Sequence, residues 1–213
     1  QQDSHALLDW LFSQPELAVR GGVVRWRDDT RPTLPELALN QVDRVVRNPR
    51  WSHQMRLDAT LPPGWGQRIT LQADLRQPLW QTDASQWRDW SGVLYGQAPQ
   101  LDLQRLRQYM DLQPLLGVAV WQGQGALRSW VTVKAGHVQG VTSDLALNTV
   151  AVQVGEQRSP LALRDLLGRV EVFQEGLEFR LSTQKLAFRT DSGLVWPGGN
   201  VQYSQTRQAR GGG

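Results

Sequence analysis

The stretch Glu36-Leu37-Ala38-Leu39-Asn40 returns, one conservative change apart, as Asp144-Leu145-Ala146-Leu147-Asn148. The echo extends beyond the phrase, because Val42 and Val46 recur at the same offsets as Val150 and Val154. Both copies stand where apolar residues alternate with polar ones, a period of two that is typical of a half-buried β-strand. The repetition predicts two rounds of one strand-rich unit, which usually builds an extended surface rather than a single catalytic pocket.

Composition narrows the classes of function. The chain has 213 residues, no cysteine and a formal net charge of +3. Without cysteine it has no disulfide, no thiol nucleophile and no cysteine-based zinc site. Its basic residues are almost all arginines placed singly, which argues against a nucleic-acid partner. No run of 18 apolar residues occurs, so we expect a soluble segment, and its abrupt ends suggest a section of a longer protein.

The periodicity predicts a mainly β fold, a repeated antiparallel meander that forms an elongated curved sheet or groove. We expect two short amphipathic helices, over residues 4–13 and 102–112. The break in alternation between Leu39 and Val42 indicates a β-bulge. Turns are predicted at Asp28-Asp29, Pro62-Pro63-Gly64 and Glu175-Gly176. The expected strands cover residues 17–27, 37–46, 53–61, 68–76, 91–97, 123–133, 138–141, 145–154, 161–163, 171–173, 177–181, 186–188 and 194–196.

The expected strands fall into two units and a tail. The first β repeat, with its N-terminal helix, covers residues 1–100, and the second, which begins with a helix, covers residues 101–204. Residues 205–213, which are rich in Arg and Gly, are expected to be a disordered tail.

Catalytic motifs are weak. His5, His53 and His137 are isolated and lack the spacing of metal ligands. Ser182-Thr183-Gln184-Lys185 matches the S-x-x-K pattern by chance, because its companion motifs are missing. Asp28-Asp29 is read as a turn rather than as a pair of metal ligands. We therefore expect no enzyme, no cofactor and no metal site.

Tryptophan is unusually abundant, with ten residues against seven Phe and Tyr together. Trp suits places that are apolar at one end and wet at the other, such as the rim of a core, a sugar platform or a lipid boundary. A glycan-binding module therefore stands among the alternatives.

Several short phrases, in order and over nearly the whole chain, resemble the AsmA-like envelope proteins of Gram-negative bacteria, specifically the YhdP type. These phrases are Trp10-Leu11 with Gln14; Val24-Arg25-Trp26-Arg27-Asp28; Leu37-Ala38-Leu39 with Val42 and Asn48; His53 with Pro62-Pro63; Trp90-Ser91-Gly92-Val93-Leu94-Tyr95; Leu127-Arg128-Ser129-Trp130; and Arg189-Thr190-Asp191-Ser192-Gly193-Leu194-Val195-Trp196-Pro197.

The resemblance implies a periplasmic section of a long protein that is anchored in the inner membrane by a helix outside this segment. Its partners would be phospholipid and neighbouring repeats of the same chain, and its curved β-groove would carry acyl chains between the inner and outer membranes. Under this hypothesis the groove is lined by alternate strand residues: Leu37, Leu39, Val42, Met55, Leu57, Ile69, Leu71 and Leu75 in the first round, and Leu145, Leu147, Val150, Leu177, Phe179 and Leu181 in the second.

The same residues would also form an ordinary closed core. The alternative is therefore a closed β-sandwich that acts as a scaffold or protein-interaction module of the cell envelope. An enzyme is the least favoured of these classes of function.

Overall fold

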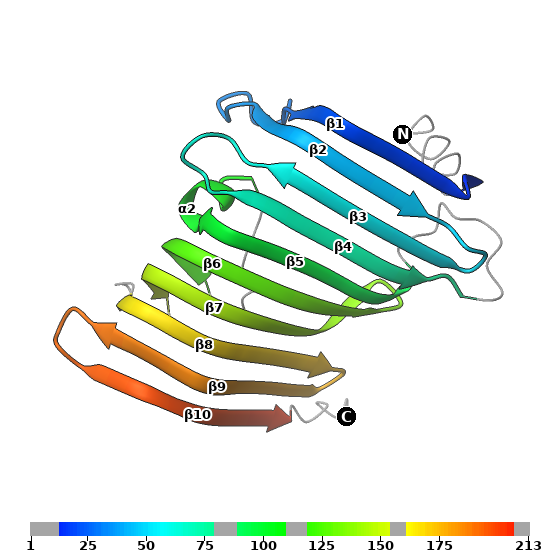
Figure 1. Cartoon of the computed structure of the whole chain (residues 1–213). Helices are drawn as coiled ribbons and strands as arrows, with labels where there is room; N and C mark the ends of the chain where they lie inside the picture. The colour runs from blue at the N-terminus through cyan, green and yellow to red at the C-terminus, as the bar shows by residue number, and fades with distance from the viewer. Residues whose placement is uncertain (1–12, 79–88, 110–118, 154–160, 207–213) are drawn as a thin grey trace. The chain divides into compact units, whose positions relative to one another are not determined.

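The computed structural model describes residues 13–78, 89–109, 119–153 and 161–206, and it is almost entirely β (Figure 1). The strands hydrogen-bond in the order of the chain, each to the next, in one ten-stranded antiparallel sheet, which confirms the predicted meander. Their bounds are β1 Glu16–Trp26, β2 Leu37–Arg47, β3 Ser52–Thr60, β4 Arg68–Arg76, β5 Ser91–Asp102, β6 Ala119–Lys134, β7 His137–Gln153, β8 Leu161–Glu175, β9 Glu178–Thr190 and β10 Val195–Thr206.

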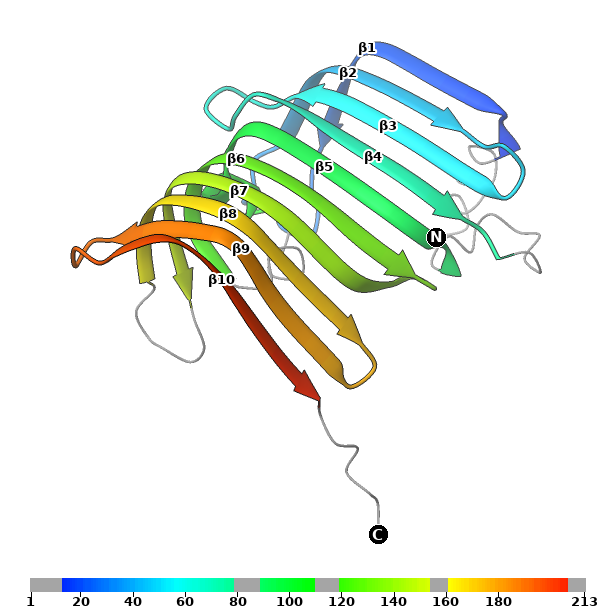
Figure 2. The ribbon, with the colours of Figure 1, turned by 60° about the horizontal axis from the view of Figure 1, so that its bottom comes forward.

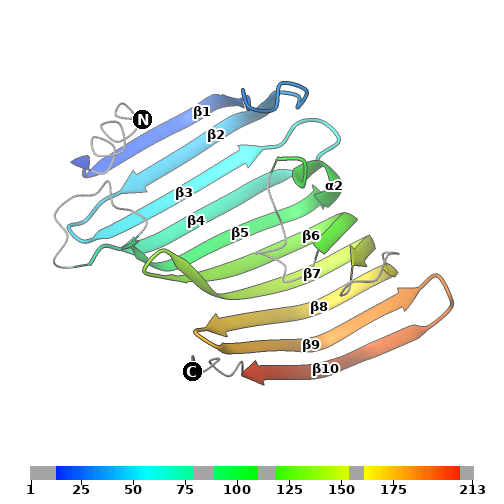
Figure 3. The ribbon, with the colours of Figure 1, turned by 180° about the vertical axis from the view of Figure 1, so that it is seen from behind.

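The contacts divide the chain into two compact units. Unit 1 comprises residues 1–98 together with the turn region 132–137, and unit 2 comprises residues 99–131 and 138–213. In unit 1, β1 to β4 and most of β5 lie side by side; in unit 2, β7, β8 and β9 bend along their length (Figure 2). The hairpin of β9 and β10 is seen from behind in Figure 3.

The first four strands match their predicted ranges to within one residue. Their turns also form as expected: the Arg31 amide donates to the Asp28 carbonyl oxygen, and the Trp65 amide donates to the Pro62 carbonyl oxygen. The Asp28 carboxylate accepts hydrogen bonds from Thr30 and Arg31, which lower its pKa to about 2. Asp28 therefore stabilises the turn that was predicted at Asp28-Asp29.

In unit 2 the expected short strands are parts of longer ones. Segments 138–141 and 145–153 belong to the single strand β7, and segments 161–163 and 171–173 belong to β8. Val154, the last residue of the predicted segment 145–154, lies outside the described residues. The polar residues between the segments of β8 and β9 include Asp165 and Lys185, both with φ of 52°. A left-handed residue adds one position to a strand and breaks its alternation without ending it. The polar interruptions are therefore bulges rather than loops.

The one helix with described bounds is α2, Leu103–Leu106, beside the end of β5 (Figure 3). Its start is as predicted, because the Asp102 carboxylate caps it by accepting a hydrogen bond from the Arg105 amide at 3.1 Å. The helix ends at Leu106, six residues short of the expected range, and residues 110–112 lie outside the described residues.

Other sequence expectations also fall outside the described residues. Residues 4–12 of the first predicted helix do so, as do residues 207–213 of the expected tail. β10 continues to Thr206, so the first two residues of that tail are strand. No helix in the described part of the chain is long and apolar enough to cross a membrane.

Candidate functional site: the apolar sheet faces

One side of the sheet in unit 1 is almost wholly apolar, and we call it the unit 1 face. Register defines it, because residues directly opposite each other on neighbouring strands point to the same side. One row across the strands, for example, runs Leu17, Val46, Met55, Ala73 and Leu94. The strand positions on this face are Leu17, Val19, Gly22, Val24, Trp26, Leu37, Leu39, Val42, Arg44, Val46, His53, Met55, Leu57, Ala59, Ile69, Leu71, Ala73, Leu75, Gly92, Leu94, Gly96 and Ala98.

The bulge predicted between Leu39 and Val42 is present and keeps both residues on the unit 1 face. Gln41 has a φ of 48°, and the pairing of β2 shifts by one position there with both neighbouring strands. Without the extra residue, the three-residue spacing from Leu39 to Val42 would place them on opposite sides. The structure therefore places all eight predicted lining residues of the first round on one face.

Burial on the unit 1 face is uneven. Val46 and Ala59 have no exposed surface, and Val42 is also buried. Met55, Leu57, Ile69 and Leu75 are half-buried, whereas Leu71 keeps 44% of its surface exposed. A large aliphatic side chain this exposed at the centre of β4 is unusual for a closed core, where neighbours bury such residues. An apolar surface thus remains partly accessible beside a buried centre.

A buried histidine lies at one end of the unit 1 face. The His53 ring stacks on Trp90 with 3.9 Å between ring centroids and 4° between planes. Nδ1 lies 2.9 Å from the Asn48 side-chain oxygen, and Nε2 lies 3.3 Å from that of Gln77. Burial lowers the pKa of His53, so the ring is neutral at pH 7. In the sequence, His53 is isolated as a metal ligand. Its partners Asn48, Gln77 and Trp90 lie outside strand β3 and are brought to the ring by the fold.

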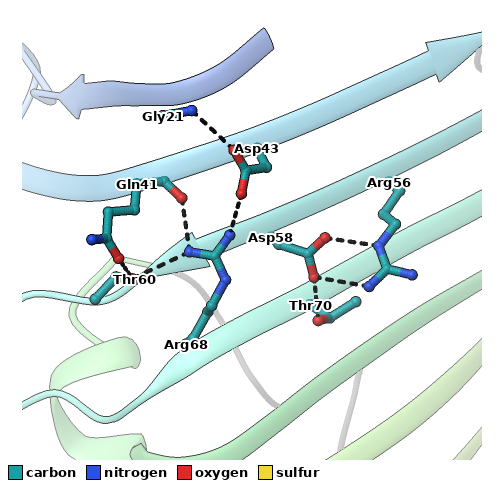
Figure 4. A network of polar contacts seen from close by, with 8 residues as sticks. All are labelled: Gly21, Gln41, Asp43, Arg56, Asp58, Thr60, Arg68 and Thr70. Atoms are coloured by element: carbon teal, nitrogen blue, oxygen red, sulfur yellow. Dashed lines mark hydrogen bonds and ion pairs between the residues drawn. The ribbon is translucent and has the colours of Figure 1, made fainter. Parts of the chain in front are cut away.

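The opposite side of unit 1 carries the charges (Figure 4). Arg68 donates to Asp43 at 2.6 Å and to the Gln41 carbonyl oxygen at 2.8 Å, and Asp43 also accepts from the Gly21 amide. Beside them, the Arg56 guanidinium lowers the pKa of Asp58. Exposed pairs of this kind stabilise a fold by at most about 1 kcal/mol each. Their main effect here is to separate a polar side from an apolar one.

An open pocket lies on this charged side of unit 1. It has a volume of about 500 Å³ and a lining of mixed polarity from β2 to β5: Val45, Arg47, Gln54, Met55, Arg56, Gln72, Ala73, Asp74, Val93 and Tyr95. The unit 1 face, on the other side of the sheet, is the apolar surface.

Unit 2 has an apolar face of its own, which we call the unit 2 face. Leu145 and Leu147 lie opposite Gly168 and Leu166. Val150, opposite Leu163, stands three positions after Leu147 with no shift in the β7–β8 register, so this register does not place it on the same side as Leu147. Further along, Leu181 pairs with Val172, and Phe179 lies two residues before Leu181 on the same side. Leu147 and Val150 are buried.

One of the six residues predicted to line the second round does not lie on a strand. Leu177 occupies the turn after Gly176, between β8 and β9, with half of its surface exposed. The turn consists of Gly176 and Leu177, between the paired residues Glu175 and Glu178, one residue later than the predicted Glu175-Gly176 turn. Leu177 is therefore a turn residue and not part of the sheet.

A row of hydroxyl groups crosses the unit 2 face, which sequence reasoning missed. The hydroxyls of Ser129 and Ser143 are 2.8 Å apart, and the Thr183 hydroxyl accepts from the Val201 amide at 3.0 Å. Ser143 and Thr183 are buried. Because their hydrogen bonds are made within the sheet, these small polar groups interrupt the apolar surface at little cost. Ser182, of the chance S-x-x-K match, donates instead to Glu171 at 3.1 Å.

The polar side of unit 2 centres on one carboxylate. Asp144 accepts hydrogen bonds from Arg169 at 2.6 Å and from Arg128 at 2.7 Å, and these bonds lower its pKa. Both guanidinium groups also lie within 6 Å of the Trp130 ring centroid, in cation–π geometry. Among the described residues, no group of three His, Cys, Asp or Glu side chains is placed to hold a metal ion.

Comparison with known proteins gives one finding. The model of a protein family described as "YhdP protein" matches residues 1–212, nearly the whole chain. Comparison with curated proteins and with solved structures gave no match.

Proposed function

Because this chain belongs to the YhdP protein family, one of AsmA-like bacterial envelope proteins, we propose that its apolar sheet faces carry phospholipid acyl chains. In this proposal the chain is a non-enzymatic section of a periplasmic bridge between the inner and outer membranes. Neighbouring repeats of the same longer protein would continue the path, and an anchor outside this segment would hold it to the inner membrane.

The observation that carries the proposal is the accessible part of the unit 1 face. Leu71 is 44% exposed and is surrounded by half-buried aliphatic residues, with the ion pairs Arg56–Asp58 and Arg68–Asp43 on the opposite side. An acyl chain of roughly 15 methylenes costs about 12 kcal/mol to move into water, at about 0.8 kcal/mol per methylene. A continuous apolar strip removes most of that barrier. No catalytic group is needed.

A scaffold function is the second candidate, because the centre of the unit 1 face is buried. Val46 and Ala59 are fully buried, as they would be in a closed β-sandwich core. The two functions differ in what touches Leu71: a lipid in the first, and only protein in the second.

Site-specific photo-crosslinking in living cells tests the proposal. Leu71 and Gln72 are successive residues of β4, both exposed, and they point to opposite sides of the sheet. A photo-reactive residue at Leu71 is expected to capture phospholipid, and one at Gln72 is not. Leu147 is less suitable, because it is only 4% exposed. Equal capture at the two positions, or none at Leu71 while a known lipid carrier is labelled, would refute the proposal.

A further inference from the structure

One charged side chain interrupts the unit 1 face. Among the described strand residues of this face, Arg44 is the only one that carries a charge at neutral pH, because the His53 ring is neutral. It stands between the buried residues Val42 and Val46 on β2. A cation in the middle of an apolar surface is unfavourable unless water or an anion solvates it.

The neighbours of Arg44 are hydrocarbon. Register places Val19 opposite it on β1 and Leu57 opposite it on β3, and Leu71 continues the same row on β4. The side chain is half-buried. It makes no hydrogen bond or ion pair with any part of the chain that the structure describes. Its guanidinium is therefore available to an external ligand.

Six other arginines of unit 1 are paired with carboxylates, whereas Arg20, Arg50 and Arg76, which are exposed rather than half-buried like Arg44, have no such partner among the described residues. These pairs are Arg25–Glu36, Arg27–Asp29, Arg31–Asp28, Arg47–Glu16, Arg56–Asp58 and Arg68–Asp43. Among the described residues, acidic partners stand on the polar side and in the turns, and none stands at Arg44. A guanidinium offers donors in a planar fork that matches a phosphate, and it is easier to strip of water than an ammonium group.

We propose that Arg44 binds the phosphate of a lipid whose acyl chains lie along the neighbouring aliphatic residues of the unit 1 face. The proposal rests on the proposed function and adds a selectivity: the face distinguishes lipids that bear a phosphate from lipids that do not. Exposed Leu71, two strands away in the same row, provides the adjoining apolar contact.

The test is a competition between two lipids with identical tails. The purified full chain is incubated with vesicles that contain dioleoylphosphatidylglycerol and dioleoylglycerol in equal amounts, and bound lipid is counted by mass spectrometry. Wild type is expected to favour the phospholipid. Arg44→Gln is expected to lower that preference about tenfold, as expected for losing one charge-assisted hydrogen bond, without reducing uptake of dioleoylglycerol. Arg44→Lys keeps the charge and should retain part of the preference.

Controls separate the possible failures. Arg56→Gln removes a paired arginine from the opposite side of the sheet and should leave the preference unchanged. An unchanged preference in a folded Arg44→Gln variant overturns the inference, as does an equal loss of both lipids. Complete displacement of the phospholipid by excess inorganic phosphate overturns the assignment to a lipid. If wild type takes up neither lipid, the proposed function itself fails and this inference fails with it.

Discussion

Replacing Gly92 by alanine is expected to destabilise unit 1 severely, whereas the same change at Gly96 in the same strand should not. Gly92 has a φ of +157°, and a Cβ atom there would lie 2.0 Å from the Asp74 carbonyl oxygen and 2.9 Å from the Leu75 Cα. Both obstacles are backbone atoms of the paired strand β4, so neither can rotate away. At Gly96 the nearest atom to such a Cβ is a flexible methyl group of Leu71, at 3.4 Å.

The magnitude follows from two terms. A side chain in that backbone region costs about 1–3 kcal/mol, and forcing an atom into a filled space costs about 1–3 kcal/mol more. Gly92→Ala should therefore lower the free energy of unfolding by roughly 2–6 kcal/mol, against about 5–15 kcal/mol for a typical domain. Gly96→Ala should change it by less than about 1 kcal/mol, because the reduced entropy of the unfolded chain offsets a mild contact.

Urea unfolding of the two variants, together with hydrogen exchange of the β4 and β5 amides, measures the difference. The exchange measurement localises the effect to unit 1 in a chain of two units, for which a single unfolding transition is not guaranteed. If Gly92→Ala unfolds at the same urea concentration as Gly96→Ala and its β4 amides stay protected, the close strand approach at this position is wrong.

Two further predictions concern pH. Burial lowers the pKa of His53, so the imidazole binds a proton more readily in the unfolded chain than in the native one. The free energy of unfolding should therefore fall as the pH drops below about 6.5, by at most ~1.4 kcal/mol per pH unit. His53→Gln should remove this slope in urea titrations, and the same change at exposed His137 should not. The lowered pKa of Asp144 has the opposite origin, hydrogen bonds from Arg169 and Arg128 to the ionised form. Asp144→Asn should cost less than about 1 kcal/mol at pH 7, and the difference from wild type should vanish in acid, below the native pKa of Asp144; a constant difference across the pH range would contradict the ion-pair explanation.

The sequence was most informative where alternation is unbroken. β4 runs from Arg68 to Arg76 as predicted, because every second residue is apolar and no left-handed residue interrupts it. In β8 the alternation changes phase at Asp165, so one long strand was predicted as two short ones, over residues 161–163 and 171–173. A period-2 pattern cannot distinguish a bulge from a loop when the intervening residues are polar.

The candidate site was predictable in its aliphatic part and unpredictable in its polar part. Leu57 and Leu71 could be placed on one face from strand alternation alone. Arg44 could not be singled out, because its importance depends on which strands flank β2 and on the absence of a nearby carboxylate among the described residues. The Ser129–Ser143 contact joins two consecutive strands of the predicted meander, but it depends on their exact register, which the alternation of apolar and polar residues does not fix.

The order of the strands also has a consequence for how such a protein is made and lengthened. Each strand of the sheet pairs with the one before it in the chain. During synthesis, β2 can therefore pair with β1 as soon as both strands have left the ribosome. Pairing between neighbours in sequence keeps the loops to be closed short, and the entropy lost in closing them is small. A gene duplication that inserts a whole hairpin would extend the sheet without rethreading any other strand. Length in this architecture can therefore evolve by simple addition.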